Sequence, residues 1–226
     1  MKKTELIQEI REAAIIAIIR GVEHEKLPPL LDALAAGGIR FAEITFDQTG
    51  RTSGEETAQS IAELKKHMAG RMHIGAGTVM TVGQADRAMT AGAEFLISPN
   101  VNPVVIRHTV AAGCVSIPGA MTPTEAAVAY ESGADFVKLF PADTLGLSYI
   151  KALMAPLSHI PFLAVGGVNE RNIGDFLATG LAGVGVGSAL TPIEWIANES
   201  YQQITEHANR YCNVVQNHRN YFGKRA

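Results

Sequence analysis

The sequence predicts one (β/α)8 barrel, and three observations support this expectation. Short apolar runs rich in β-branched residues recur eight times, and such unbroken runs are typical of buried parallel strands. Amphipathic stretches of helical length separate them, with no linker between. Glycine stands just before most of the later runs, where it suits the left-handed turn that ends a helix. Eight alternating strands and helices close into a barrel with the helices outside.

The expected strands cover residues 14–20, 39–46, 72–78, 94–98, 114–118, 135–140, 161–165 and 182–187. The expected helices cover 24–36, 55–69, 82–91, 103–112, 123–132, 147–155, 170–179 and 192–217. Sequences such as TPTE (122–125) combine an N-cap Thr, a Pro at the first helical position and the Glu of a capping box. We expect one domain over 1–226, with a short helix before the first strand.

The tail over 198–226 is expected to form a helix with one apolar face, which covers either the amino-terminal end of the barrel or a subunit contact. A doubly wound open sheet is the alternative fold. Its dinucleotide fingerprint should come early, but GAGTVM (75–80) lacks the last small residue of that pattern and follows two strands.

Composition narrows the class of protein. Apolar residues make up 47% of the chain and charged residues 18%, with a net charge of −3, which predicts a sizeable core and favours neither nucleic acid nor a membrane surface as partner. The amino terminus lacks the unbroken apolar core of a signal peptide. Cys114 and Cys212 are far apart in the sequence and are expected to be free thiols, so the cytoplasm is the expected compartment.

Two ionisable residues lie within apolar strands, Lys138 and Glu43. Because side chains alternate along a strand, Lys138 shares one face with Phe136 and Phe140, and Val137 shares the other face with Leu139. The layer beneath the helices must be apolar, so Lys138 is expected to point to the barrel axis. The same argument places Glu43 inward on its strand.

An inward Lys beside an inward Glu has two interpretations, and the residues alone leave both open. One is a structural ion pair. The other is a nucleophilic amine with an acid–base partner, because burial lowers the pKa of a Lys and leaves neutral amine to attack a carbonyl. A carboxylate such as Glu43 can then move protons, directly or through water.

Glycine-rich loops follow the last two expected strands. AVGGV (164–168) and GVGVGSAL (183–190) each precede an expected helix. Backbone N–H groups in such loops, together with a helix N-terminus, bind phosphate, and barrels often place a phosphate site at these two loops. Arg20 ends the first strand, where it can hold a carboxylate or a phosphate or form a rim salt bridge. Thr78 is either a donor to a substrate carboxylate or a turn residue.

Seven motifs in chain order support a family assignment: AEITF with Glu43, GAGTV (75–79), FLISPN (95–100), IPGAMTPTE (117–125), VKLFPA (137–142), AVGGV and GVGSAL. Together they resemble the 2-keto-3-deoxy-6-phosphogluconate / 4-hydroxy-2-oxoglutarate aldolase family, over about residues 14–190. The resemblance implies a class I aldolase that needs no cofactor or metal, acts on a phosphorylated keto acid and releases pyruvate and an aldehyde. It also implies a homotrimer.

The resemblance implies roles for particular residues. Lys138 would form the Schiff base and Glu43 would move protons. The substrate would contact Arg20, Thr78, Pro99, Pro118, Phe140 and Val165. Its phosphate would contact Gly166, Gly167, Gly187 and Ser188.

Two positions depart from the common pattern of the family. Asp47 stands just after the second strand, where many relatives have an Arg that meets the substrate carboxylate. Val165 stands where many gluconate-type relatives have Thr, and Val is similar to the galactonate-type relatives. The sugar-acid epimer is therefore open.

Three other functions are alternatives to an aldolase of this class. A metal-dependent aldolase needs clustered His ligands, and the seven His residues form no ligand-like pair in the sequence. A phosphosugar isomerase shares the phosphate loops but has no use for an attacking Lys. A non-catalytic phosphosugar-binding barrel would bind ligand without turnover.

Overall fold

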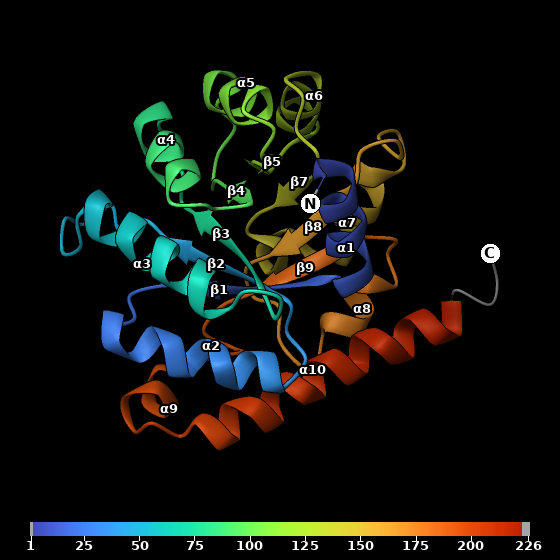
Figure 1. The fold of residues 1–226 in the computed structure, drawn as a ribbon. Helices are drawn as coiled ribbons and strands as arrows, with labels where there is room; N and C mark the ends of the chain where they lie inside the picture. Colours follow the sequence, from blue (N-terminus) through green and yellow to red (C-terminus); the bar gives the residue numbers. More distant parts are fainter. Residues whose placement is uncertain (1, 223–226) are drawn as a thin grey trace.

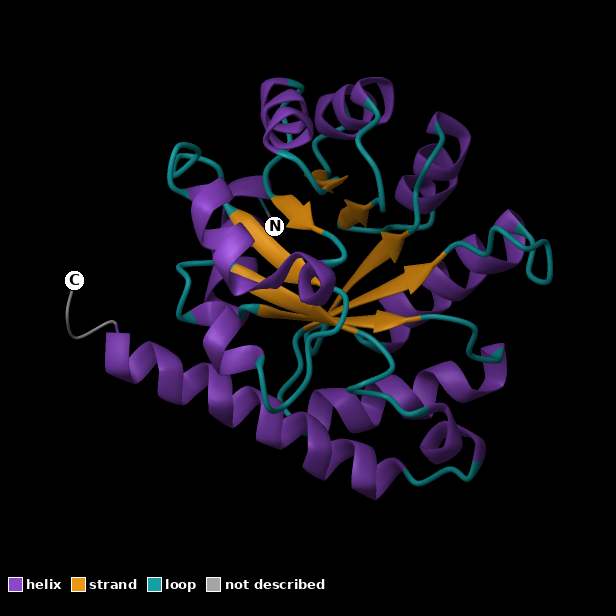
Figure 2. Cartoon of the chain, turned by 180° about the vertical axis from the view of Figure 1, so that it is seen from behind, coloured by secondary structure: helices purple, strands orange, loops and turns teal. Residues whose placement is uncertain are grey.

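The computed structural model describes residues 2–222 and confirms the barrel. Figures 1 and 2 show the strands at the centre with helices around them. The strands are β1 (Ile15–Ile19), β2 (Phe41–Thr45), β3 (His73–Gly77), β4 (Phe95–Ile97), β5 (Val115–Ile117), β6 (Gly119–Ala120), β7 (Val137–Leu139), β8 (Phe162–Val165) and β9 (Gly183–Val186). All pair in parallel, in the order β5-β4-β3-β2-β1-β9-β8-β7-β6.

The fifth expected strand is split in two. Pro118 separates β5 from β6, because proline has no N–H to donate to a ladder. β5 and β6 stand at opposite ends of the sheet order, yet they are consecutive in the chain. The short segment 115–120 therefore closes the ring, and nine assigned strands fill the eight positions of the barrel.

The helices are α1 (Lys3–Ala13), η1 (His24–Lys26), α2 (Leu27–Ala36), α3 (Gly54–His67), α4 (Val82–Thr90), α5 (Pro103–Ala111), α6 (Pro123–Glu131), α7 (Ala142–Met154), α8 (Ile173–Leu177), α9 (Ile193–Ala197) and α10 (Tyr201–Phe222). The capping box at Thr122 forms as its sequence predicts, and a further one forms at Thr81. α7 begins earlier than expected and bends at Gly146, which has a φ of 75°.

One expected helix is wrong. The single helix over 192–217 is two helices, α9 and α10, because Glu199 between them takes a φ of 54°, outside the helical region. The expected helix over 170–179 shortens to α8, because Asn169 and Asn172 form a turn in which the Asn169 N–H donates to Asn172 Oδ1 at 2.8 Å.

The tail does not cover the amino-terminal end of the barrel. α10 lies instead along the outside, against α2 and α8 (Figure 1), and residues 223–226 of the tail lie outside the described residues. It is α1 that closes the amino-terminal end. Leu6 and Ile10 of this helix pack in the barrel interior against residues that include Ile16, Phe41 and Phe136.

Charged groups attach α1 to the strands above it. Glu9 accepts hydrogen bonds from Arg40 at 2.5 Å and from His73 at 3.1 Å, and Lys3 pairs with Asp135 at 2.9 Å. The amino-terminal end is therefore occupied by structure, which leaves the carboxyl ends of the strands for a binding site.

Ile10→Ala tests the role of α1 as a plug. Ile10 is 1% exposed inside the barrel, so truncation should lower the free energy of unfolding by about 2–4 kcal/mol. Urea unfolding with an unchanged m-value measures this loss. Ile7→Ala, at a partly buried neighbour on the same helix, is the control and should cost less; an equal loss in the two variants would contradict the plug.

None of the described helices is long and apolar enough to cross a membrane.

Candidate active site

The carboxyl ends of the strands bring the expected polar residues together on one face of the barrel. Glu43 and Thr45 belong to β2, Lys138 to β7, and Arg20 and Thr78 directly follow β1 and β3. Side chains alternate along these strands as expected. Phe41 and Phe136 belong to the interior cluster. Ala42, Val137 and Leu139 belong to the cluster that faces the helices. Chain segments far apart in sequence thus contribute to one site.

Lys138 is held inside the ring. Its side chain is buried, with 6% of the residue exposed, and its amine lies 4.9 Å from the centre of the Phe140 ring. The Lys138 N–H donates to the Pro118 carbonyl at 2.8 Å, and β6 pairs with β7 so that Gly119 faces Lys138. The segment 115–120, which closes the ring, therefore fixes the position of the backbone from which the Lys138 side chain extends.

Glu43 is almost completely buried, with 1% exposed. Gly77 on the neighbouring strand makes room for it, since a Cβ at Gly77 would lie 2.6 Å from Glu43 Oε1. Oε2 of Glu43 has no hydrogen-bond partner among residues 2–222. A buried carboxylate oxygen without a partner is costly, and it is the kind of atom that a bound substrate or its proton can satisfy.

The environment shifts both groups toward their neutral forms. Burial lowers the pKa of Lys138; the charge of Arg20 acts in the same direction, while Glu43 opposes it. Burial raises the pKa of Glu43 against the opposing charges of Lys138 and Arg20. The two groups are thus close enough to influence each other, and the amine loses its proton more readily than an exposed Lys would.

Arg20 and Thr78 lie beside this pair. The Arg20 Nη2 donates to Thr78 Oγ1 at 3.2 Å, and Thr78 takes a φ of 57°, which a β-branched residue rarely adopts. One cavity of about 500 Å³ is lined by Arg20 together with Gly187 and Ser188. A second cavity, of about 430 Å³, joins Arg20 to Thr45 and the loop after β2.

The loop after β8 has a backbone conformation that favours glycine. Gly166 and Gly167 have φ values of 93° and 76°, and a Cβ on Gly167 would lie 2.1 Å from the Asp143 Cβ. The helices after the loops that follow β8 and β9 are displaced, however, because α8 begins only at Ile173 and α9 at Ile193. The groups that directly follow the two strands are therefore loop N–H groups, and each helix starts later than the sequence predicts.

The remaining expected contacts line the same end of the barrel. Val165 is the last residue of β8 and is buried, and Pro118 lies between β5 and β6. Pro99 follows β4, with its backbone packed so close to Gly119 that a Cβ there would lie 2.6 Å away. Phe140 is 37% exposed beside Lys138.

Comparison with known proteins identifies the family. Residues 6–207 match the family described as KDPG and KHG aldolase. The chain belongs to this family. It is therefore an aldolase, a carbon–carbon lyase.

Individual members of the KDPG and KHG aldolase family show how close the relation is. The chain is 41% identical to the probable 2-dehydro-3-deoxy-6-phosphogalactonate aldolase of Rhizobium meliloti, over 79% of this chain and 82% of that protein. It is 34% identical to the 2-dehydro-3-deoxy-phosphogluconate aldolase of Treponema pallidum, over 93% and 97%. The structure of KDPG aldolase from Legionella pneumophila, described with pyruvate captured as a covalent carbinolamine, superposes with a TM-score of 0.80 at 29% identity, over 92% and 97%.

Sequence reasoning missed the part that Asp47 plays in this aldolase. Its carboxylate accepts hydrogen bonds from the backbone N–H groups of Thr49, Arg51 and Thr52 at 2.9, 2.7 and 3.1 Å. Bonds to Thr49, first from its backbone and then from its side chain, lower the pKa of Asp47 to about 2. Asp47 thus shapes the loop after β2. The sequence DQT carried this signal, since Asp often bonds to the backbone two residues on.

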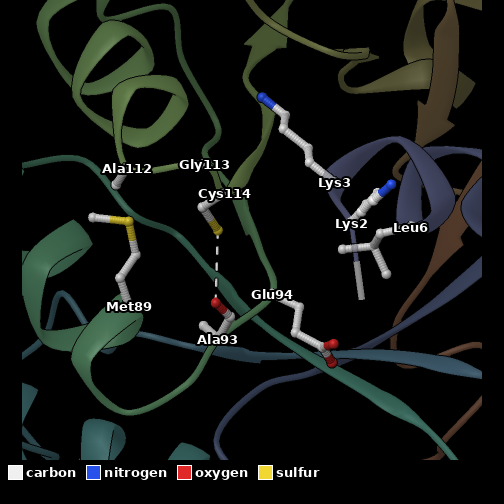
Figure 3. A pocket seen from close by; sticks show the side chains of 9 residues that line it. All are labelled: Lys2, Lys3, Leu6, Met89, Ala93, Glu94, Ala112, Gly113 and Cys114. Atoms are coloured by element: carbon white, nitrogen blue, oxygen red, sulfur yellow. Dashed lines mark hydrogen bonds between the residues drawn. The ribbon is translucent and has the colours of Figure 1, made fainter.

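A small cavity at the opposite end of the barrel has no part in this site. It measures about 240 Å³ and is lined by residues that include Lys3, Glu94 and Cys114 (Figure 3). The Cys114 thiol donates to the Ala93 carbonyl at 3.6 Å, and burial raises its pKa to about 12. Cys212, also a buried free thiol, has its pKa raised by burial to about 11. Neither sulfur is an activated nucleophile.

Proposed function

We propose that the protein cleaves a 2-keto-3-deoxy-6-phospho sugar acid to pyruvate and glyceraldehyde 3-phosphate, with Lys138 as the Schiff-base residue. The observation that carries the proposal is a lysine held inside the barrel with a lowered pKa beside a buried carboxylate. A relative whose structure is described with pyruvate captured as a covalent carbinolamine supports the same chemistry.

The reaction follows from the two groups. The neutral Lys138 amine adds to the C2 carbonyl, and the carbinolamine hydroxyl takes a proton from solvent and leaves as water, which gives an iminium. The C4 hydroxyl gives its proton to Glu43, the C3–C4 electron pair moves to the iminium, and the aldehyde leaves. The resulting enamine takes a proton at C3, and water releases pyruvate and the free amine. Because the iminium accepts the electron pair, the protein supplies one amine and one proton carrier.

The substrate is held at both ends in this proposal. Arg20 and Thr78 lie together beside the reacting pair and suit its carboxylate end. Gly166, Gly167, Gly187 and Ser188 suit the phosphate, supported by the positive φ of Gly166 and Gly167 and by the cavity that Ser188 and Gly187 share with Arg20. The short keto acid 4-hydroxy-2-oxoglutarate, which gives pyruvate and glyoxylate, is a second substrate in this proposal.

Borohydride reduction in the presence of pyruvate tests the function. Reduction should fix pyruvate on the chain, and peptide mass mapping should find it on Lys138. An isomerase or a non-catalytic binder forms no such adduct, so an unmodified Lys138 in a chain that still binds phosphosugars would overturn the proposal.

The galactonate-configured substrate is a second candidate, and Val165 favours it. Val165 ends β8 on the same strand face as the interior residue Leu163, above the site. Its side chain offers no hydrogen bond to a substrate hydroxyl, and the relative from Rhizobium meliloti is named as a probable galactonate-type aldolase.

Val165→Thr tests this specificity. The added hydroxyl should raise kcat/KM for the gluconate epimer relative to the galactonate epimer by about 10-fold. The measurement is steady-state pyruvate release from both epimers. Val82→Thr, the same change at a partly buried position on α4, is the control. An unchanged ratio in Val165→Thr would remove Val165 from substrate selection.

We propose a homotrimer in the cytoplasm. Apolar side chains are exposed on neighbouring elements α6 and α7, among them Tyr130 at 39% and Tyr149 at 38%, which supports a subunit contact there. The free buried thiols support a reducing compartment. Light scattering coupled to size exclusion measures the number of chains, and a monomer would contradict the trimer.

A further inference from the structure

The carboxyl-terminal helix α10 reaches the two glycine loops from behind. The Tyr211 hydroxyl donates to the Ala189 carbonyl at 3.2 Å, and Ala189 directly follows Ser188 of the loop after β9. The Tyr211 side chain is 1% exposed, so this hydrogen bond forms away from solvent. It connects α10 to a loop that the proposed function assigns to the phosphate.

The same helix also meets the loop after β8. Glu170 stands three residues after Gly167, and its carboxylate accepts a hydrogen bond from Arg210 Nε at 3.2 Å. Burial raises the pKa of the Tyr211 phenol to about 12, and the nearby Glu170 backbone acts in the opposite direction. The Tyr211 hydroxyl therefore bonds to the loop after β9 and lies near the loop after β8.

A cavity beside the Tyr211 hydroxyl makes its hydrogen bond to Ala189 important for holding the loop in place. A cavity of about 500 Å³ lies between the loops and α10, lined by Asn169, Glu170, Arg171, Ala189, His207 and Tyr211. Loops that border a cavity gain less from packing than loops set against a filled core. The Tyr211 ring is itself held, because it stacks on His207 with the ring centres 5.1 Å apart.

We propose that Tyr211 is a positioning residue whose hydroxyl sets the spacing of the two glycine loops for a phosphate group. The inference rests on the proposed phosphate site. It gives a role in substrate recognition to a helix that reaches beyond residue 207, where the family match ends.

Tyr211→Phe tests the inference, because it removes the hydroxyl and keeps the ring. The KM for the 6-phosphorylated substrate should rise about 5- to 10-fold, since the buried hydrogen bond from Tyr211 to Ala189 is lost. The inhibition constant of inorganic phosphate should rise by the same factor. Cleavage of unphosphorylated 4-hydroxy-2-oxoglutarate should keep its kcat and KM.

The control is Tyr201→Phe, which removes a phenol hydroxyl at the start of the same helix. It should leave kcat and KM unchanged for both substrates. Both substrates are tested on one preparation, so a reduced folded fraction cancels in their ratio. If the wild-type chain has the same KM for the phosphorylated and the unphosphorylated substrate, the proposed phosphate site is refuted. If the wild-type chain has a lower KM for the phosphorylated substrate and Tyr211→Phe keeps this whole difference, the role of Tyr211 is refuted. The role is also refuted if Tyr211→Phe raises the KM equally for both substrates.

Discussion

Lys138→Ala is expected to abolish aldol cleavage, with kcat/KM lower by about 10⁴-fold or more, because in the proposed reaction Lys138 forms the covalent intermediate. The variant should also take up no pyruvate on borohydride reduction. The coupled release of pyruvate from substrate measures the first effect, and intact-protein mass measures the second. The fold should survive, since the change removes a costly buried amine and leaves Glu43 free to bind a proton.

The matched control is Lys151→Ala, an exposed lysine on α7 next to β7 in the chain. It should retain full activity and full labelling. A Lys138→Ala variant that still cleaves substrate at a tenth of the wild-type rate or faster would remove the Schiff base from Lys138. Retained binding of phosphosugar in the inactive variant is expected, because the glycine loops do not involve the amine.

Glu43→Gln is expected to lower kcat by about 10²- to 10⁴-fold, the usual share of a general acid–base group. Some activity should remain, because water can carry part of the proton traffic. Borohydride should still fix pyruvate on Lys138, only more slowly, which separates the loss of proton transfer from the loss of the nucleophile. Glu131→Gln, at the exposed end of α6, is the control and should behave as wild type.

The pH profile gives this prediction a sign. In the proposed reaction, the active form needs a neutral Lys138 amine and an ionised Glu43. As the pH falls, Glu43 takes up its proton at a pH above the usual Glu range, because burial raises its pKa, and Lys138 takes up its proton below the usual Lys range. Activity should therefore fall on the acid side, and Glu43→Gln should alter that limb. A profile identical to wild type would exclude Glu43 as the titrating base.

The sequence predicted the parts of the site that depend on strand periodicity. Lys138 and Glu43 face inward because side chains alternate, and a charged group in an otherwise apolar strand could face only the axis. The glycine-rich segments after the last two strands were also visible in the sequence, and Gly166 and Gly167 take the positive φ values that favour glycine. These inferences use only neighbours in the chain, and the barrel then brings the strands together.

Features that depend on contacts between distant segments were not predictable. Glu199 breaks the last expected helix although its residue type favours helix, because the chain must turn to lay α10 against α2 and α8. The bond from Tyr211 to Ala189 joins residues on separate elements, and no pattern in the sequence announces it. Tertiary packing decided these points.

The two buried thiols, Cys114 and Cys212, allow local opening of the folded structure to be followed by alkylation. A thiol whose proton is released only near pH 11 or 12 reacts very slowly with maleimide at neutral pH. Alkylation of Cys212 in the native chain therefore follows the transient release of α10 from α2 and α8, and alkylation of Cys114 follows movement of the residues around its cavity. The same chemistry gives a clock for comparing variants in crude lysate, independent of any assay of turnover.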